Sequence, residues 1–521
     1  MSRARTIAAL LLLLAVPRLA RIAYPQVWIE DESYLNGAFL LARGFLPYRD
    51  FPLPHLPLLE MLLASIFQIA PIAIGTAEIF TQTAAFGASV LVFFAGRRLG
   101  DTLTGASAAL VFATSGLLFR YHLFEREVFV VVPVLAAFLI ALPREHERDS
   151  TRRAVVVGVL MFAALAVKLT AIAALVALAL QLHLAGRRRF ALATVVTTMG
   201  LLALAMIVLA ARFRTDFIVQ VFVFRAVHAA FPSLGVKVDE LRYSMDVSFA
   251  FGVAGAALIL LRRDFRAWAG PLLQLASGAI VLVFLNPTYW AHTGIELLPW
   301  LSLAAGYLVS AFLRSMAPRR GRRSSARPPS RALTFACAGA AVLLLLFVSP
   351  IRNLNWEAGD GSVDGFGYRD RRELETLGEF VRAHASSDEL VATPPIIAFI
   401  ANRREVVPYA EIGGEIQELT AIVARDGYAA ALSNESLRRR SFWESVEASR
   451  DRTTPLLEEA LSAQRVAVLV NDSADDLMPI LITNVPAESL QRDGYQLATV
   501  TPHYEAWIKG EGTTRKEQGA R

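Results

Sequence analysis

Residues 6–37 read TIAALLLLLAVPRLARIAYPQVWIEDESYLNG, an apolar run followed at a short distance by three consecutive carboxylates. The apolar run has the composition of a membrane-spanning helix, and two arginines precede it. Because the cytoplasmic flanks of membrane helices are enriched in arginine and lysine, this order predicts a cytoplasmic N-terminus. No small-x-small cleavage site follows the run, which argues against a signal peptide. The three carboxylates are therefore expected just outside the membrane, on the opposite side.

Composition extends this interpretation to the whole chain. The 521 residues are 55% hydrophobic and 19% charged, with a mean hydropathy of +0.45, whereas soluble domains carry about 25% charged residues. Residues 1–350 hold 33 Lys/Arg against 18 Asp/Glu, and residues 351–521 hold 19 against 28. Basic residues fall between apolar runs rather than on one face, so nucleic-acid binding is not indicated. The single cysteine, Cys337, excludes an intrachain disulfide and a cysteine-based metal site.

Arginine clusters between the apolar runs predict the membrane topology. With these clusters in the cytoplasm, we expect a polytopic α-helical membrane protein with about eleven transmembrane helices. The expected spans lie near residues 6–23, 79–96, 102–119, 128–143, 153–167, 169–185, 190–211, 247–261, 267–285, 294–313 and 332–350. The run at 57–74 contains two prolines and a glutamate, which favours an interfacial helix instead. Aromatics interleaved with charge over 212–246 suggest either a second interfacial helix or a mobile lid.

The pattern changes after residue 350. Helical stretches alternate with short apolar strands near 390–393, 465–471, 495–500 and 504–509, which predicts a soluble α/β domain. An odd number of spans places this domain outside the cytoplasm. The predicted organisation is a transmembrane domain over 1–350, with its first outer loop at 24–78, and an extracytoplasmic α/β domain over 351–521.

The first outer loop carries the most informative motif. After Glu30, Asp31 and Glu32 the chain continues through a tyrosine and a glycine to LLARGFLPYRDFPLPHLP at residues 40–57. Crowding of carboxylates beside the low-dielectric membrane should raise the pKa of at least one of them, which suits a general base. A solvated loop that anchors the end of the first helix is the alternative interpretation of the triplet alone.

This order resembles the first outer loop of the integral-membrane (C-type) glycosyltransferase superfamily. Within it, the resemblance is to the branch of protein O-mannosyltransferases, lipid A aminoarabinose transferases and lipopolysaccharide-core galacturonosyltransferases. In that branch an Asp-Glu pair follows the first span, with a tyrosine, a glycine, a Pro-Tyr and a proline-containing helix after it. Glu30 beside the pair leaves a register shifted by one residue open.

The resemblance implies a sugar transfer from a polyprenyl-phosphate donor to an acceptor hydroxyl in the cell envelope, by hexosyl or pentosyl transfer in a bacterial inner membrane. Asp31 would be the catalytic carboxylate that deprotonates or polarises the acceptor, and Glu32 would orient the acceptor or a neighbouring base. A polyprenyl tail stays in lipid while its phosphate and sugar reach the interface. No glycine-rich phosphate loop for a nucleotide sugar is seen in the sequence.

A second acidic site is implied in the outer loop near residues 120–127. Glu127, which precedes an apolar run, resembles the family position best, and Glu125 is the alternate. An arginine–glutamate anchor at the membrane interface is the competing interpretation. His292, which lies shortly before a proline-containing span, resembles a substrate-binding position, although it could equally be a neighbour of interfacial aromatic residues.

Cations are needed to bind the donor phosphate. Lys168 is the sharpest candidate, because a lone lysine between two apolar segments is costly in lipid and should face a polar cavity. It also resembles a lysine that the family carries there, although snorkelling to the interface is the alternative. The further candidates for phosphate or substrate binding are Arg43, Arg49, Arg225, Tyr48 and His55.

No metal or other cofactor is expected, since the outer loops contain no Asp-x-Asp or His-x-x-x-His spacing. The expected partners are the lipid-linked donor, membrane lipids and an envelope acceptor. A transporter or flippase of lipid-linked saccharides is the main alternative, disfavoured because nearly all charges fall at the expected interfaces. A catalytically silent relative with a scaffolding C-terminal domain is a third possibility.

Overall fold

A computed structural model describes most of the chain. The described residues are 3–24, 26–28, 32–143, 150–227, 247–262, 265–285, 291–316, 339, 368–406, 410–440, 442–472, 485–502 and 504–510. The chain forms two compact units, each assembled from separate stretches. Unit 1 comprises Met1–Tyr24, Ile79–Val208 and Pro232–Glu357, and unit 2 comprises Pro25–Glu78, Leu209–Phe231 and Ala358–Arg521. The first outer loop thus belongs to the same unit as the C-terminal domain. A simple division of the chain at residue 350 would separate the two.

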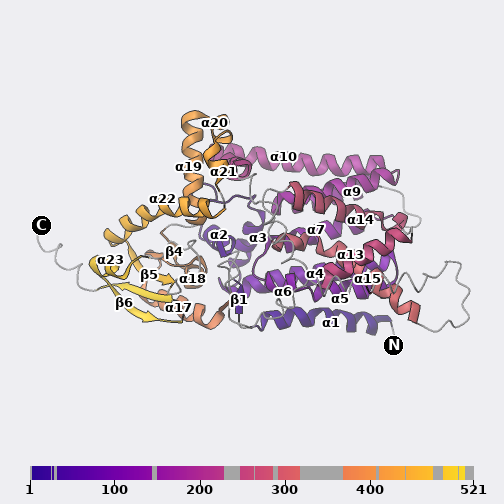
Figure 1. Cartoon of the computed structure of the whole chain (residues 1–521), viewed down its shortest axis with the longest axis horizontal. Coiled ribbons are helices and arrows are strands. Elements are labelled where there is room, and N and C mark those ends of the chain that lie inside the picture. Colours follow the sequence, from indigo (N-terminus) through magenta and orange to yellow (C-terminus); the bar gives the residue numbers. More distant parts are fainter. Residues whose placement is uncertain are drawn as a thin grey trace, which may run out of the picture. The chain divides into compact units, whose positions relative to one another are not determined.

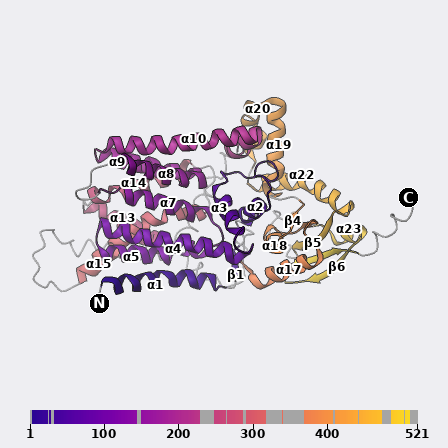
Figure 2. The ribbon, with the colours of Figure 1, turned by 180° about the vertical axis from the view of Figure 1, so that it is seen from behind.

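Unit 1 is a bundle of helices that run side by side in both views (Figure 1 and Figure 2). Its elements are α1 (Arg3–Ile22), α4 (Ile74–Leu99), α5 (Thr102–Ala113), α6 (Gly116–Arg120), α7 (Arg126–Ala141), α8 (Thr151–Val167), η1 (Leu169–Ala171), α9 (Ile172–Leu184), the first part of α10 (Arg188–Ile218), α13 (Val247–Leu261), α14 (Phe265–Gly278), η4 (Ala279–Leu285), η5 (Ala291–Glu296) and α15 (Leu298–Met316).

Small residues let these helices approach closely. A Cβ atom added to Gly255 of α13 would lie 2.0 Å from the backbone oxygen of Ala304 in α15, and one added to Gly306 would lie 2.6 Å from the backbone of Ala108 in α5. Close backbone approach at glycine and alanine is typical of helix pairs in membranes, where dispersion forces drive association. Helices α5, α13 and α15 therefore form a tightly packed centre of unit 1.

These helices lie over the spans expected from the sequence. Among the described residues, Ile74–Leu99 and Arg188–Val227 are long and apolar enough to cross a membrane, and several other apolar helices are shorter. The expected span at 332–350 falls outside the described residues. The fold is thus largely helical, while the number of membrane crossings stays a prediction.

Helical structure continues beyond the span predicted at 190–211. The helix continues through Ile218, with a kink at Arg214 (φ 50°, ψ −125°), and is followed by η2 (Val219–Val223) and α11 (Phe224–Val227). Apolar side chains of this continuation pack against Leu419 and Val423 of the C-terminal domain, and this burial stabilises the extra turns. Of the predicted interfacial helix or lid at 212–246, residues 228–246 lie outside the described part.

Unit 2 begins with the first outer loop. Its elements are β1 (Gln26–Trp28), α2 (Glu32–Ala42) and α3 (Leu58–Phe67), the last of which lies within the predicted interfacial helix. One face of α3 buries Leu59, Leu63 and Phe67, while Met61 and Leu62 are exposed. A short helix with an apolar exposed edge suits a membrane surface, and its interfacial position stays a prediction.

The C-terminal part of unit 2 is the expected α/β domain. Its helices are α17 (Arg371–His384), α18 (Pro395–Ala401), α19 (Ala410–Asp426), α20 (Tyr428–Leu432), α21 (Glu435–Arg439), α22 (Phe442–Ser462) and α23 (Ala487–Arg492). Its strands are β2 (Tyr368–Asp370), β3 (Leu390–Ala392), β4 (Arg404–Glu405), β5 (Val466–Asp472), β6 (Tyr495–Val500) and β7 (Tyr504–Lys509). Strand β2 pairs with β1, and the other strands form a five-stranded sheet in the order β4-β3-β5-β7-β6.

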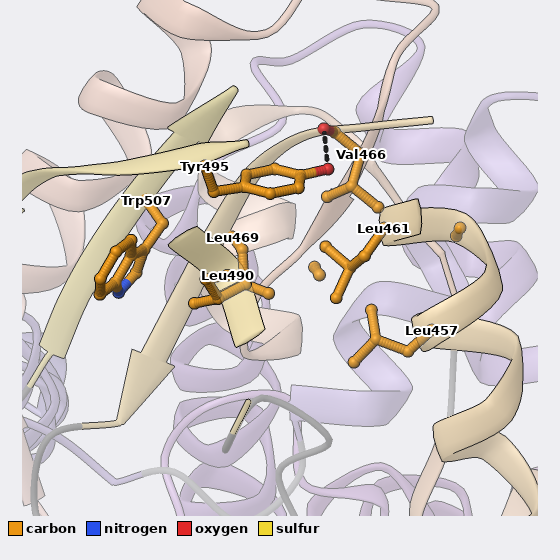
Figure 3. Close-up of a cluster of buried hydrophobic side chains, with 9 residues drawn as sticks. Leu457, Leu461, Val466, Leu469, Leu490, Tyr495 and Trp507 are labelled. Carbon is orange, nitrogen blue, oxygen red and sulfur yellow. Dashed lines mark hydrogen bonds between the residues drawn. The ribbon is translucent and has the colours of Figure 1, made fainter. Parts of the chain in front are cut away.

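A compact apolar core holds this sheet together (Figure 3). Side chains from α22, α23 and the strands gather there, including Leu461, Leu469, Leu490 and Trp507. The Tyr495 hydroxyl donates to the Val466 carbonyl at 2.8 Å, so the phenol is buried with its polar end satisfied. Desolvation raises the pKa of Tyr495 above its usual value, and the phenol stays protonated.

Candidate active site

A buried polar cluster in unit 1 brings together residues from three segments. Glu125 precedes α7 and Glu127 lies in its first turn, where the helix dipole favours a carboxylate. Both carboxylates are buried, at 2% and 0% exposure. The Lys168 ammonium forms an ion pair with Glu127, and Nε2 of His292 lies 3.7 Å from the same carboxylate.

A fifth residue, Glu296, completes the cluster. Glu296 accepts a hydrogen bond from the Thr170 hydroxyl at 2.6 Å and faces both Lys168 and His292. Glu296 is not among the site residues predicted from the sequence. Its position inside the predicted span at 294–313 was a usable signal, because a carboxylate within a membrane span is costly and is seldom retained without a partner.

Local backbone contacts explain how these side chains are held. The Arg126 guanidinium, buried beside Glu127, donates to the Val167 carbonyl at 3.0 Å and so joins the start of α7 to the end of α8. Lys168 follows in an extended conformation between α8 and η1. The Tyr121 ring packs against the His292 imidazole with centroids 5.7 Å apart.

The cluster also offers a donor set for a cation. One ligand atom each from Glu125, Glu127 and His292 lie within 4.8 Å of one another, as a divalent ion would require. Because His292 is distant in sequence from Glu125 and Glu127, no motif reveals the full set. The Lys168 ammonium already neutralises part of the negative charge, so the cluster fits a dication only in part.

A second polar cluster lies in unit 2. Nε2 of His55 contacts the Tyr34 hydroxyl at 2.9 Å and the Arg225 guanidinium at 2.7 Å. Arg225 also interacts with the Tyr34 hydroxyl. Among the described residues, the side-chain partners of half-buried Arg225 are thus two ring groups and no carboxylate, an arrangement that leaves its positive charge available to an anion.

The loop that carries His55 is fastened to η2. Gln220 accepts a hydrogen bond from the Leu53 amide and donates one to the Tyr48 carbonyl, each at 2.8 Å. Tyr48 takes a left-handed φ of 66°, and its hydroxyl donates to the His55 carbonyl at 2.6 Å. Such a conformation is uncommon for a residue with a side chain and persists only where surrounding contacts hold it.

The remaining predicted cations of the first loop have other partners. Arg49 pairs with Asp50 at 2.8 Å, and this contact holds the pKa of the Asp50 carboxyl below its usual value. Arg43 donates to the Asn402 carbonyl at 3.4 Å. The structure therefore brings His55, Tyr48 and Arg225 together in unit 2, while Arg43 and Arg49 are engaged elsewhere in that unit.

Of the acidic triplet Glu30, Asp31 and Glu32, only Glu32 belongs to the described residues. Asp31 lies outside the described residues, and Glu32 is the first residue of α2. The catalytic roles of both residues stay predictions, as do the roles assigned to Lys168, Glu125, Glu127 and His292.

No protein-family model matches the chain, and no curated protein matches it in sequence. Solved structures do match it. ArnT from Cupriavidus metallidurans, solved with undecaprenyl phosphate, aligns with a TM-score of 0.58 at 11% identity and covers 98% of this chain and 99% of that one. AglB, an oligosaccharyltransferase from Archaeoglobus fulgidus solved with an inhibitory peptide and a dolichol-phosphate, aligns with a TM-score of 0.52 at 13% identity over 98% of this chain and 75% of its own.

The chain has the fold of C-type glycosyltransferases. The resemblance predicted from the first outer loop is confirmed at the level of the fold.

We expect the Lys168–Glu127 pair to be energetically coupled. Lys168→Met leaves the Glu127 carboxylate buried without the lysine ammonium. Loss of one partner of a buried ion pair lowers the free energy of unfolding by about 3–5 kcal/mol. The double variant Lys168→Met/Glu127→Gln removes both charges and should recover more than half of the lost thermal stability. Unfolding midpoints of the purified protein in detergent measure this cycle. Strictly additive effects of the two substitutions would contradict the coupling, and Lys168→Arg, which keeps the charge, serves as the control.

Proposed function

We propose that the protein is a glycosyltransferase that moves a sugar from a polyprenyl-phosphate donor to an envelope acceptor hydroxyl at the outer face of the membrane. The main support for this proposal is the position of Arg225, which contacts His55 and Tyr34 and has no carboxylate among its described partners. The chain that holds this arginine shares the fold of ArnT. The undecaprenyl phosphate bound to ArnT and the dolichol-phosphate bound to AglB support the donor class. These relatives are transferases and give no support to the transporter alternative.

The proposed reaction is a single displacement. The acceptor oxygen attacks the anomeric carbon while its proton passes to the Asp31 carboxylate, and Glu32 orients the acceptor. The bond between the anomeric carbon and the phosphate oxygen breaks, and the electron pair leaves with the polyprenyl phosphate. A positioned carboxylate of this kind contributes about 10²–10⁴-fold to the rate.

Negative charge develops on the phosphate during this step. The donor is a phosphodiester with one charge, and the departing phosphomonoester gains a second. A cation held in place before the reaction stabilises the transition state more than the ground state. Arg225 has the properties for this task, because His55 and Tyr34 orient its guanidinium without neutralising it. Lys168 is a second proposed phosphate ligand, with its ammonium placed by Glu127.

The carboxylates of unit 1 are proposed as the second acidic site. Glu127 and Glu125 present oxygens that can accept hydrogen bonds from sugar hydroxyls, with His292 beside them. The transferred sugar is proposed to be a hexose or pentose, with mannosyl transfer as one form. The proposed location is a bacterial inner membrane, with the N-terminus in the cytoplasm and the C-terminal domain outside.

We further propose that transfer needs no metal ion. The support is the Lys168 ammonium within the Glu125–Glu127–His292 donor set, which supplies positive charge where a dication would otherwise be needed. A divalent ion placed there would lie beside this ammonium, and the repulsion would weaken its binding.

Asp31→Asn is expected to lower turnover by about 10²–10⁴-fold, because the amide cannot accept the acceptor proton. A membrane-fraction assay with labelled polyprenyl-phosphate sugar measures the rate, and expression level and membrane insertion should not change. Asp426→Asn is the matched control, since Asp426 pairs with Arg425 at 2.8 Å on an exposed surface. Undiminished turnover in Asp31→Asn would overturn the proposed function.

Arg225→Gln is expected to lower kcat/KM by about tenfold to a hundredfold, the equivalent of one hydrogen bond to a charged group. Most of the loss should appear in kcat, because the charge on the phosphate increases as the bond breaks. Steady-state kinetics over a range of donor concentration separate the two constants. The control Arg492→Gln replaces an arginine whose side chain is 75% exposed. Equal kinetics for the two variants would rule out a phosphate-binding role for Arg225.

Exhaustive treatment with EDTA is expected to leave the rate of transfer unchanged within about twofold, because Lys168 supplies the local positive charge. The assay is repeated after addition of Mg²⁺ or Mn²⁺. Loss of activity with EDTA and its recovery with either ion would show that the metal-independent proposal is wrong.

A further inference from the structure

In the sequence, the acidic triplet follows β1 and ends at the first residue of α2, and both elements are attached to the C-terminal domain. On the N-terminal side, β1 pairs with β2 in antiparallel register, with Gln26 opposite Asp370 and Trp28 opposite Tyr368. Strand β2 runs directly into α17, since Asp370 is the N-cap whose side chain accepts from the Arg372 amide at 2.8 Å. The chain entering the triplet is therefore hydrogen-bonded to the C-terminal domain.

On the C-terminal side, α2 is attached by a buried polar contact. The Asn36 side-chain amide donates to the Glu405 carboxylate in β4. Both residues are buried, at 1% and 6% exposure. Strand β4 pairs with β3 in the five-stranded sheet, so this carboxylate has a fixed position within the domain. A buried hydrogen bond to a charged group is among the stronger contacts available to a short helix.

Apolar and cationic contacts extend the same attachment. The Phe399 ring of α18 packs on Phe39 of α2 with centroids 6.3 Å apart and on Phe67 of α3 at 5.8 Å. The Arg404 guanidinium lies 4.6 Å from the centroid of the Phe45 ring, just beyond the end of α2. Helix α2 has only 11 residues, and helices of this length are marginal without packing against other elements.

The first outer loop is also attached where it ends. The Arg371 guanidinium of α17 forms an ion pair with Glu78, whose carboxylate is fully buried. The domain therefore contacts the loop before the triplet, after it and again at its far end. Contacts with segments on both sides of a short stretch restrict its position far more than one contact would.

We propose that the C-terminal domain positions the acidic loop for the transfer reaction, and that Asn36 and Glu405 are positioning residues for Asp31; this inference rests on the proposed function. Asp31 lies five residues before Asn36 in the sequence and directly before Glu32, the first residue of α2. Displacement of a catalytic group by about 1 Å can cost about 10²-fold in rate. The domain thus has a role in the reaction without contributing a reacting group.

The test compares variants that break or keep the Asn36–Glu405 contact in the full-length protein. Asn36→Ala and Glu405→Ala are each expected to lower kcat by about 10–100-fold while KM for the donor changes by less than about threefold. Glu405→Gln keeps an acceptor oxygen and should retain kcat within about threefold of the wild type. The double alanine variant should be no slower than the slower single variant, because both substitutions break the same contact.

Asn471→Ala is the matched control. Asn471 is a buried asparagine of the same domain, and its amide donates to the Val485 carbonyl at 2.9 Å, away from the acidic loop. It should lower the unfolding midpoint with little effect on the kcat of the folded protein. Hydrogen exchange of the amides in residues 32–42 provides a second readout, which should accelerate in Glu405→Ala and not in Asn471→Ala.

The outcomes distinguish this inference from the proposed function. If Asp31→Asn is inactive while Asn36→Ala and Glu405→Ala turn over at the wild-type rate, the positioning role is wrong and the transferase proposal stands. The same conclusion follows if Asn471→Ala lowers kcat as much as Glu405→Ala does, or if exchange over 32–42 is unchanged. If Asp31→Asn remains active, the proposed function fails, and the positioning role fails with it.

Discussion

The cost of placing charge inside an apolar helix bundle governs how the polar residues of unit 1 are arranged. A charged side chain removed from water loses hydration that must be offset by a partner of opposite charge or by hydrogen bonds. Lys168 and Glu127 meet this requirement for each other, and Glu296 and His292 gather around them. The buried arginines of α1 meet it with neutral acceptors: Arg21 donates to the Phe119 carbonyl at 2.8 Å. Polar groups in the bundle therefore collect into connected clusters, and such clusters are where binding and catalysis can be placed.

In unit 2, the short length of the elements of the first outer loop limits their stability. Strand β1 has three residues and α2 has eleven, too few for either to be stable alone. Strand β2, Glu405 and Phe399 supply the missing contacts from the C-terminal domain. The first outer loop is thus part of a larger folded unit, in which the C-terminal domain contacts the elements on both sides of residues 29–31.

The sequence predicted much of the fold because hydropathy and strand patterns are local properties. The span at 247–261 and the strand at 504–509 coincide with α13 and β7. Helical structure continues beyond residue 211 after a kink at Arg214, and its apolar side chains pack against Leu419 and Val423. For the site, the sequence and the family resemblance singled out Glu127, Lys168 and Arg225 one by one. It did not reveal that Glu127 pairs with Lys168, or that Tyr34 and His55 together contact Arg225.

The amino-acid sequence by itself determined the membrane character of the chain, the positions of most helices and strands, and the acidic loop after the first helix. These follow from the transfer free energy of consecutive side chains, which needs no knowledge of distant residues. Only the tertiary structure decided which charges are partners and that the first loop folds with the C-terminal domain. Glu405 lies 369 residues from Asn36, and a hydrogen bond over such a separation leaves no periodic or compositional trace in the sequence. It forms because a buried carboxylate must be satisfied by whatever donor the fold brings to it.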